Sequence, residues 1–180
     1  MITTFALLTG VLLGFLVSYN LKESILIPFR AFTFLSNFVG LVSALVGTKS
    51  QLGQTLQVSA FLMLSTTFIV YHAILPKFES FSDNLGKYLD LIQHGIGPIS
   101  FFLWFVFTYK YQISLSNILC SLIVPSIWLA YTLFREQKGI DSGYPFLRIS
   151  VLGPLRVCIN VFLIILANIF VAGLLRYLGN

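Results

Sequence analysis

Six apolar runs, separated by short polar breaks, constrain the fold of this chain more than any other feature of its sequence. The runs cover residues 4–20, 29–47, 56–76, 91–110, 113–134 and 155–178. Most approach the roughly 20 residues that a helix needs to cross a bilayer. Membrane-spanning strands would instead show segments of about ten residues with alternating polarity, and the sequence has none. We therefore predict an all-α, polytopic transmembrane bundle of six helices.

The composition supports a lipid environment. Hydrophobic residues make up 57% of the chain and charged residues only 9%, whereas soluble domains carry roughly a quarter charged residues. So few charges cannot cover a surface that faces water. The first run has no basic residue before Lys22, so we expect it to be a retained helix rather than a cleaved signal peptide. No repeat or linker divides the chain, and residues 1–180 are predicted to form a single, multi-pass membrane domain.

The net charge of +5 does not indicate a nucleic-acid partner. The basic residues are scattered singly between the apolar runs, whereas phosphate binding needs a basic cluster. Cys120 and Cys158 both lie in apolar runs and lack the spacing of a metal or redox motif. We expect neither a disulfide framework, nor a metal site, nor a cofactor.

The basic residues are distributed unequally between the two predicted faces of the membrane. Three basic residues belong to the even-numbered face, namely Lys49, Lys110 and Arg176. Eight belong to the odd-numbered connections, namely Lys22, Arg30, Lys77, Lys87, Arg135, Lys138, Arg148 and Arg156. Because cytoplasmic connections are enriched in Lys and Arg, this pattern predicts that the odd-numbered connections are cytoplasmic and that both termini lie outside.

Polar residues inside the apolar runs concentrate near the odd-numbered face. Polar groups in a membrane helix are costly and usually face the bundle interior. Counting spans places the following residues within the first turns from that face: Thr33, Ser36, Asn37, Tyr71, His72, Asp90, His94, Tyr131, Arg156 and Asn160. The opposite end has little comparable polarity. This predicts a pocket that opens toward one face or laterally to lipid, rather than a pore.

The spacings sharpen this prediction. Thr33, Ser36 and Asn37 follow the i, i+3, i+4 pattern of one helix face, and that face continues through Gly40 and Gly47 as a small-residue packing surface. Asp90 and His94 are also four residues apart, so the carboxylate can reach the imidazole. Pro98, one turn further on, is expected to kink its helix or free a backbone carbonyl.

Each of these residues also has a purely structural interpretation. A helical Thr such as Thr33 commonly bonds back to a carbonyl, and Asn37 commonly joins two helices. His72 and Arg156 suit the membrane interface, and Asp90 suits a helix start in water. Other polar residues fit an aromatic belt or helix packing, namely Tyr71, Trp104, Tyr131, Tyr144 and Asn168.

Three chemistries compete for this cluster. In nucleophilic hydrolysis, Thr33 or Ser36 attacks a carbonyl, His94 takes the proton and Asp90 orients the imidazole. In haem binding, His72 and His94 serve as axial ligands. Transport would favour polar residues at the midplane and broken helices in matched halves, which the sequence lacks. A non-enzymatic lipid-binding role also remains open.

Several short motifs occur in the order and spacing of a known family. They are Phe-Thr-Phe-Leu-Ser-Asn at 32–37, Tyr-His at 71–72, Asp-Leu-Ile-Gln-His at 90–94 with Pro98, Pro125, Tyr131, Gly139, Tyr-Pro-Phe-Leu at 144–147, Gly153 and Asn160. Together they resemble the androgen-induced integral membrane protein family, whose members are six-helix intramembrane threonine hydrolases. The resemblance covers most of the chain and points to the bacterial relatives, hence to a bacterial cell membrane.

The resemblance implies hydrolysis of fatty acid esters of hydroxy fatty acids, with Thr33 as nucleophile and His94 as its base. A lipid or fatty acid ester is then the expected substrate. The sequence also suggests Asp90 as the residue that orients His94. Ser36, Asn37 or a tyrosine hydroxyl would stabilise the oxyanion. Arg148 or Arg156 would bind a substrate carboxylate. The remaining candidates near the substrate are Tyr71, His72, Tyr131 and Asn160.

Overall fold

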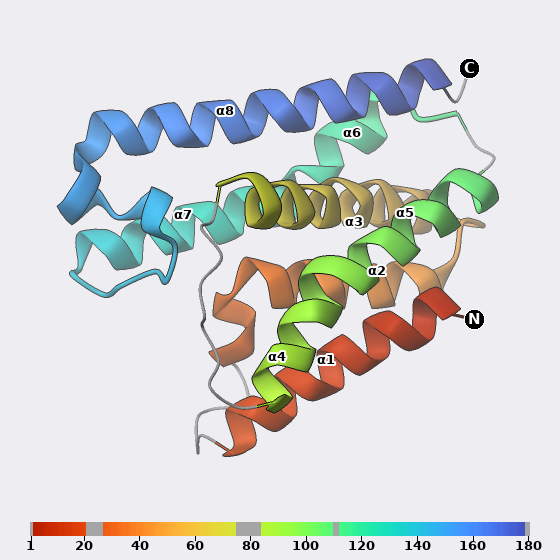
Figure 1. Ribbon diagram of the computed structural model, residues 1–180. Coiled ribbons are helices and arrows are strands. Elements are labelled where there is room, and N and C mark those ends of the chain that lie inside the picture. Colours follow the sequence, from red (N-terminus) through yellow and green to blue (C-terminus); the bar gives the residue numbers. More distant parts are fainter. Residues whose placement is uncertain (1, 21–26, 75–83, 110–111, 179–180) are drawn as a thin grey trace.

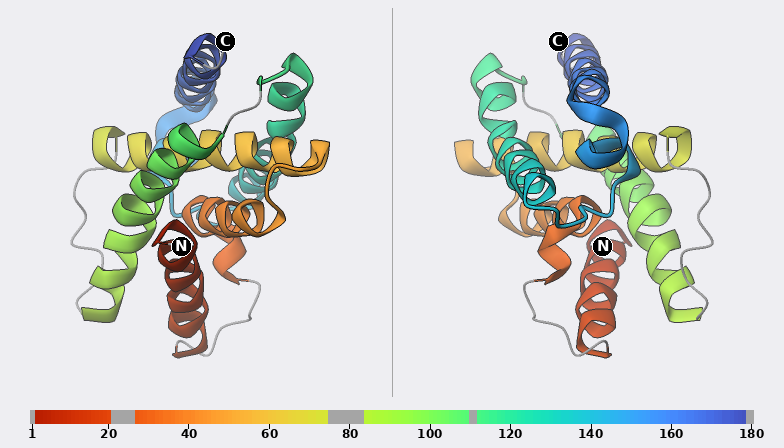
Figure 2. Two further views of the ribbon diagram at one scale, coloured as in Figure 1. Left: turned by 90° about the vertical axis from the view of Figure 1, so that its right-hand side faces the viewer. Right: turned by 90° about the vertical axis from the view of Figure 1, so that its left-hand side faces the viewer.

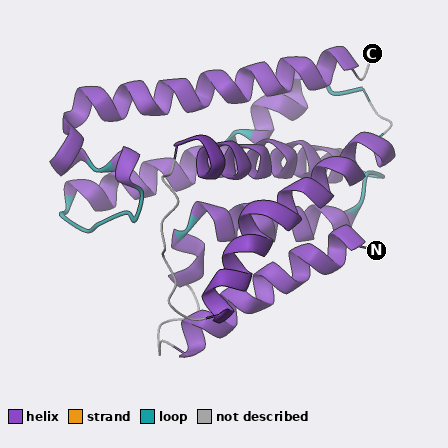
Figure 3. Cartoon of the chain, viewed as in Figure 1, coloured by secondary structure: helices purple, strands orange, loops and turns teal. Residues whose placement is uncertain are grey.

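The structure is a computed structural model that describes residues 2–20, 27–74, 84–109 and 112–178. All regular structure in these residues is helical, as the sequence predicts (Figure 3). The elements are α1 (Ile2–Asn20), η1 (Ile27–Arg30), α2 (Phe32–Val46), α3 (Gln51–Ile69), η2 (Val70–Ile74), α4 (Asn84–Leu91), η3 (Ile92–Ile96), α5 (Gly97–Thr108), α6 (Leu115–Ser121), α7 (Ile123–Gln137), η4 (Pro145–Leu147) and α8 (Ile149–Leu178).

These elements combine into six helical segments within the described part of the chain. The third segment is α3 continued by the π-helical turn η2, and the fourth is α4, the π-helical turn η3 and α5. The fifth is α6 and α7, joined at Leu122. The six predicted helices are therefore all present, one for each apolar run.

Several helices begin earlier than their apolar runs. The third begins at Gln51 rather than 56, because the Ser50 hydroxyl accepts a hydrogen bond from the Gly53 N–H at 3.1 Å and caps the helix. The fourth begins at Asn84 and the last at Ile149, ahead of the predicted residues 91 and 155. In α8 the backbone turns at Gly153, whose φ is 75°, directly before Pro154. Helix ends follow such local chemistry rather than hydropathy alone.

Four of the helices are long and apolar enough to cross a membrane, namely Gln51–Ala73, Gly86–Thr108, Leu115–Gln137 and Ile149–Tyr177. The apolar parts of α1 and α2 are shorter, at Ile2–Leu16 and Phe32–Val46. The 15 residues of α2 extend about 22 Å, less than the roughly 30 Å of a bilayer core. The structure thus confirms an all-α chain with four full-length apolar helices, and crossing by all six stays a prediction.

Helix α2 lies between α1 and α3, which are its main packing partners (Figures 1 and 2). Gly40 faces both neighbours: a Cβ there would lie 3.1 Å from Leu64 and 3.3 Å from Leu7. The predicted small-residue surface of α2 therefore lets three helices approach closely. Leu7 belongs to the main hydrophobic core, in which Val58 and Phe101 are also fully buried. Helix α8 differs, because large apolar side chains are exposed along most of its length.

One end of the molecule gathers the segments that carry the predicted site. The starts of α2, α4 and α8 and the ends of α3 and α7 lie toward the left of Figure 1, opposite both termini and the α2–α3 connection. Lys87 in α4 and Lys138 at the end of α7 thus lie at one end, and Lys49 lies at the other, as span counting predicts. Lys22 and Lys110 fall outside the described residues.

Candidate active site

Thr33 stands in the first turn of α2 and faces His94 across the boundary with the fourth helical segment. The start of α2 follows the short helix η1 directly, and the Ala31 N–H bonds to the Pro28 carbonyl at 3.0 Å. The Thr33 Oγ1 lies 2.9 Å from His94 Nε2. The predicted approach of these two side chains is confirmed. Thr33 is 9% exposed, so the hydroxyl is almost entirely removed from solvent.

The other ring nitrogen of His94 faces Asp90. His94 Nδ1 lies 2.9 Å from the Asp90 carboxylate Oδ1 and 3.2 Å from the Asp90 carbonyl oxygen. Both of these oxygens are acceptors, so the geometry favours the tautomer that carries its proton on Nδ1. Nε2 is then a lone-pair acceptor for the Thr33 hydroxyl. The i, i+4 contact that the sequence permits is therefore formed.

Tyr71 completes a chain of four side chains. Its hydroxyl donates to the second oxygen of the Asp90 carboxylate. Its ring stacks on the His94 imidazole, with centroids 4.0 Å apart and planes inclined by 18°. Tyr71 therefore fixes both Asp90 and the ring plane of His94, and it is a support for the imidazole more than an element of a membrane aromatic belt.

Two of the site residues, His94 and Tyr71, lie in π-helical turns. In η3, which contains His94, the Gly97 N–H bonds to the Ile92 carbonyl five residues earlier. Pro98 follows directly and has no N–H to offer the His94 carbonyl. The turn η2 contains Tyr71 in the same way. Such turns add a residue to a helix and re-aim its side chains, and they are frequent at functional sites. Pro98 signals the first of them in the sequence, but the second has no comparable signal.

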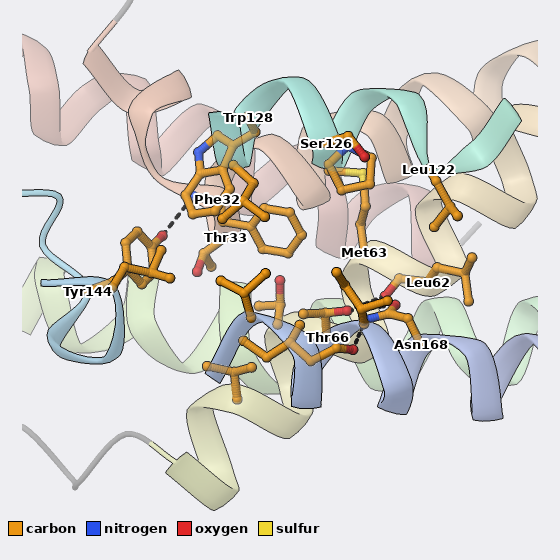
Figure 4. Close-up of a pocket in the computed structure, with 18 of the residues that line it drawn as sticks. Phe32, Thr33, Leu62, Met63, Thr66, Leu122, Ser126, Trp128, Tyr144 and Asn168 are labelled. Atoms are coloured by element: carbon orange, nitrogen blue, oxygen red, sulfur yellow. Dashed lines mark hydrogen bonds between the residues drawn. The ribbon is translucent and has the colours of Figure 1, made fainter. Parts of the chain in front are cut away.

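A cavity of about 240 Å³ begins at Thr33 and His94 and runs along α3 and α8 (Figure 4). Its walls are mostly apolar, and Leu62, Met63 and Leu122 are among the lining side chains. On α8 the lining residues run from Val161 to Ala172, a length of about 16 Å at 1.5 Å per residue. The cavity thus has a polar end and a long apolar body, as predicted.

One polar pair interrupts the apolar body of the cavity. The Thr66 hydroxyl lies 2.9 Å from the Asn168 side-chain oxygen and 2.8 Å from the Leu62 carbonyl. Asn168 was predicted to serve helix packing, and this hydrogen bond does join α3 to α8. Both residues also line the cavity.

Tyr144 is a part of the site that its sequence position did not reveal. Its hydroxyl accepts a hydrogen bond from the Phe32 N–H at 2.7 Å, at the very start of α2. The N–H and hydroxyl of the nearby Thr33 favour the ionised form of this phenol. Burial raises the pKa of the Tyr144 phenol above its ordinary value, against the opposing effect of these donors. The motif at 144–147 was the available signal, but it could not show where the loop docks.

Ser36 and Asn37 lie behind Thr33 and do not line the cavity. The Ser36 hydroxyl bonds to the Thr33 carbonyl at 2.8 Å and to the Thr67 hydroxyl at 2.9 Å. The Asn37 amide donates to the carbonyls of Thr33 at 2.8 Å and Gln93 at 3.0 Å. The structure therefore uses both side chains to join α2 to its neighbours.

His72 and Tyr131 are not brought to the site. His72 is exposed and packs on Phe68, with ring centroids 4.5 Å apart. Tyr131 is 46% exposed and lies under the Arg135 guanidinium at 5.9 Å. Neither lines the cavity. Haem ligation by His72 and His94 is disfavoured by this arrangement, because both nitrogens of His94 already face protein groups.

Arg148, Arg156 and Asn160 also lie away from the cavity lining. Arg148 makes a two-point contact with Asp141, with Nη2–Oδ2 at 2.6 Å and Nε–Oδ1 at 3.1 Å. The Gly143 N–H, and to a smaller extent this arginine, hold the pKa of the exposed Asp141 carboxyl below its ordinary value. Arg156 is exposed on α8. The Asn160 amide donates to the Phe146 carbonyl at 2.9 Å and so fastens η4 to α8.

Among the described residues, no three His, Cys, Asp or Glu side chains are grouped to hold a metal ion. Comparisons with protein-family models, with curated proteins and with solved structures give no match. The chemistry of the site therefore rests on its own geometry.

Proposed function

We propose that this protein is a multi-pass membrane hydrolase of lipid esters, with Thr33 as nucleophile, His94 as general base and Asp90 as the group that orients the imidazole. The observation that carries this proposal is the 2.9 Å contact of Thr33 Oγ1 with His94 Nε2 at the polar end of an apolar cavity. A hydroxyl needs a base within such reach to become a nucleophile. The proposal includes membership of the androgen-induced integral membrane protein family, whose motif order the chain resembles.

The proposed reaction has two halves. Thr33 Oγ1 forms a bond to the ester carbonyl carbon while its proton moves to His94 Nε2, and collapse of the tetrahedral intermediate sends that proton to the departing alcohol. Water then attacks the acyl-threonine, giving a proton to Nε2, and collapse releases the acid and returns the proton to Thr33. The Asp90 carboxylate, 2.9 Å from Nδ1, stabilises the imidazolium formed in both halves.

The substrate class follows from the cavity. A long apolar body matches an acyl chain, and the polar end matches an ester group, as binding sites fix orientation with few polar groups in an apolar lining. Fatty acid esters of hydroxy fatty acids are the specific class that the resemblance implies. The protein is proposed to reach such lipids by lying in the bilayer, with all six helical segments crossing it and α2 enclosed by α1 and α3.

Covalent labelling tests the proposal. The purified protein in detergent is treated with an alkyl fluorophosphonate, and the modified peptide is located by mass spectrometry. We expect a phosphonyl adduct on Thr33 of the wild type and none on the Thr33→Ala variant. A wild-type protein that binds fatty acid esters but neither forms the adduct nor hydrolyses them would instead indicate a lipid-binding protein. A haem absorption band in the purified protein would indicate electron transfer.

A further inference from the structure

The segment between α7 and α8 returns to the start of α2 and brings Tyr144 with it. Its last part, η4, is held by the bond from Asn160 to the Phe146 carbonyl and by Leu147, which is fully buried. The Tyr144 ring packs edge-on against Trp128, with centroids 5.3 Å apart at 89°. The Trp128 N–H in turn donates to the Arg30 carbonyl at 2.9 Å, just before α2. The phenol is therefore fixed at both its ring and its oxygen.

The hydroxyl of Tyr144 is oriented by the hydrogen bond that it accepts. Its oxygen receives the Phe32 N–H, which has no partner within α2 because it stands in the first turn. The hydroxyl hydrogen must then point away from that N–H. In Figure 4 the Tyr144 and Thr33 oxygens lie next to each other at the polar end of the cavity. A hydroxyl that accepts a hydrogen bond from an amide N–H becomes a stronger donor, and the positive end of the α2 dipole adds to this effect.

We propose that Tyr144 is the oxyanion donor of the reaction: its hydroxyl donates to the ester carbonyl oxygen as Thr33 attacks. This inference rests on the proposed function and assigns the one role that the Thr33, His94 and Asp90 chain does not fill. When Thr33 Oγ1 bonds to the carbonyl carbon, the C=O electron pair moves onto oxygen and the Tyr144 O–H bond points at it. When the intermediate collapses, the pair returns to the C–O bond and Tyr144 keeps its proton.

Several other polar groups of the described cavity are already engaged, whereas the Ser126 hydroxyl, which also lines it, makes no hydrogen bond to a described residue. The Tyr71 hydroxyl donates a hydrogen bond to Asp90, and the Thr66 hydroxyl has two acceptors within 2.9 Å. The Ser36 and Asn37 donors are bonded to backbone or hydroxyl oxygens behind Thr33. Because burial keeps the Tyr144 phenol protonated to higher pH than an ordinary tyrosine, it remains a donor across the neutral range.

The test is the Tyr144→Phe variant in a hydrolysis assay on a long-chain lipid ester in detergent micelles. Loss of an oxyanion donor typically lowers kcat by about 10²–10³-fold. We expect a loss of this size with little change in KM, and a matching loss in the rate of phosphonyl labelling at Thr33. The matched control is Tyr131→Phe, which removes an exposed hydroxyl outside the cavity and should leave kcat unchanged.

A second comparison separates chemistry from loop anchoring. Asn160→Ala releases η4 from α8 but keeps the Tyr144 hydroxyl, so it should lower thermal stability while retaining most of kcat. Wild-type kcat in Tyr144→Phe, or an equal kcat loss in Asn160→Ala, would overturn the assignment. If Tyr144→Phe fails to fold, fluorotyrosine at position 144 keeps the ring and its bonds while changing the acidity of the phenol. It should shift kcat, and an unshifted kcat would refute the role.

The two proposals fail in different ways. If the wild-type protein is neither labelled at Thr33 nor active on lipid esters, the proposed function is wrong. If the wild type is labelled and active while Tyr144→Phe matches it, only the oxyanion assignment is wrong.

Discussion

Thr33 and His94 are separated by 61 residues in sequence, yet their side chains meet at 2.9 Å between the first turn of α2 and the π-helical turn η3. Asp90 occupies the opposite side of the same imidazole, also at 2.9 Å. A hydroxyl, an imidazole and a carboxylate are thus aligned in the order that activates a hydroxyl for attack. The alignment lies at the end of a cavity that both Thr33 and His94 line.

Replacement of Thr33 tests the nucleophile. Thr33→Ala should abolish ester hydrolysis, because no other hydroxyl lies within reach of His94 Nε2 among the described hydrogen bonds. It should cost only about 1 kcal/mol of unfolding free energy, the usual net value of one hydrogen bond. Thr33→Ser keeps the hydroxyl and should retain measurable turnover. Wild-type hydrolysis by purified Thr33→Ala would contradict the mechanism.

The two histidines of the chain provide a matched pair. His94→Ala removes the base and should lower kcat by about 10²–10⁴-fold, the typical contribution of general acid–base catalysis. His72→Ala removes an exposed ring that packs on Phe68 and should leave turnover near that of the wild type. Steady-state assays of both variants measure the difference. Equal losses of kcat in the two variants would contradict the assignment of His94 as the base.

Asp90 and Tyr71 should behave as one unit. Asp90→Asn removes the charge that stabilises the imidazolium and should lower kcat while the bundle stays folded. Tyr71→Phe removes only the hydroxyl that donates to Asp90, so its effect should be smaller. Because the two groups touch, the double variant should lose less than the product of the single losses. Strictly multiplicative losses would show that Tyr71 does not act through Asp90.

Much of the fold was predictable on the premise of a lipid environment, which leaves few alternatives. An apolar run of sufficient length must satisfy its own backbone polar groups, so each of the six runs became a helix. The proximity of Thr33 and His94 was predictable for a similar reason: span counting places both about one turn inside the same face. The i, i+4 spacing of Asp90 and His94 also needs no tertiary information.

Other features depend on long-range contacts that sequence periodicity does not contain. Ser36 and Asn37 share a helix face with Thr33, but 3.6-residue spacing cannot tell a cavity from a packed neighbour, and α3 and η3 cover them. Arg148 was a predicted ligand for a substrate carboxylate, but in the structure its guanidinium already contacts the Asp141 carboxylate. Tyr144 required the docking of a connection onto α2, over a separation of 112 residues from Phe32.

The Asp141 and Arg148 pair predicts a small acid sensitivity outside the cavity. Because the folded state lowers the pKa of Asp141, its ionised form stabilises the fold above the ordinary value of about 3.9. That contribution is lost as pH falls through this value toward the lower folded pKa. Both side chains are exposed, so the contribution should be below about 1 kcal/mol. Asp141→Asn should therefore flatten the fall of melting temperature between about pH 5 and pH 3.

The Arg148→Gln variant tests whether the other member of this ion pair binds substrate. If the guanidinium is only the partner of Asp141, this variant should keep the wild-type KM for an ester that carries a free carboxylate. A large rise in KM for that ester alone would restore Arg148 as a substrate-binding residue. Michaelis constants for a carboxylate-bearing ester and a neutral ester of equal chain length make the distinction.

Two glycines in one stretch of helix give the sharpest test of how His94 is held. A Cβ on Gly97 would lie 2.6 Å from the Asn37 side-chain oxygen and 3.0 Å from the Ile92 carbonyl. The Asn37 side chain is held by two hydrogen bonds, so either these bonds or the backbone of η3 must shift. A Cβ on Gly95 would meet only a Leu91 methyl at 3.8 Å. Gly97→Ala should therefore lose about 1–3 kcal/mol of unfolding free energy, as overpacked cores do, and most of its turnover. Gly95→Ala should be nearly neutral in both. If the two variants unfold at the same temperature and hydrolyse esters equally well, the close approach of α2 to η3 does not position His94.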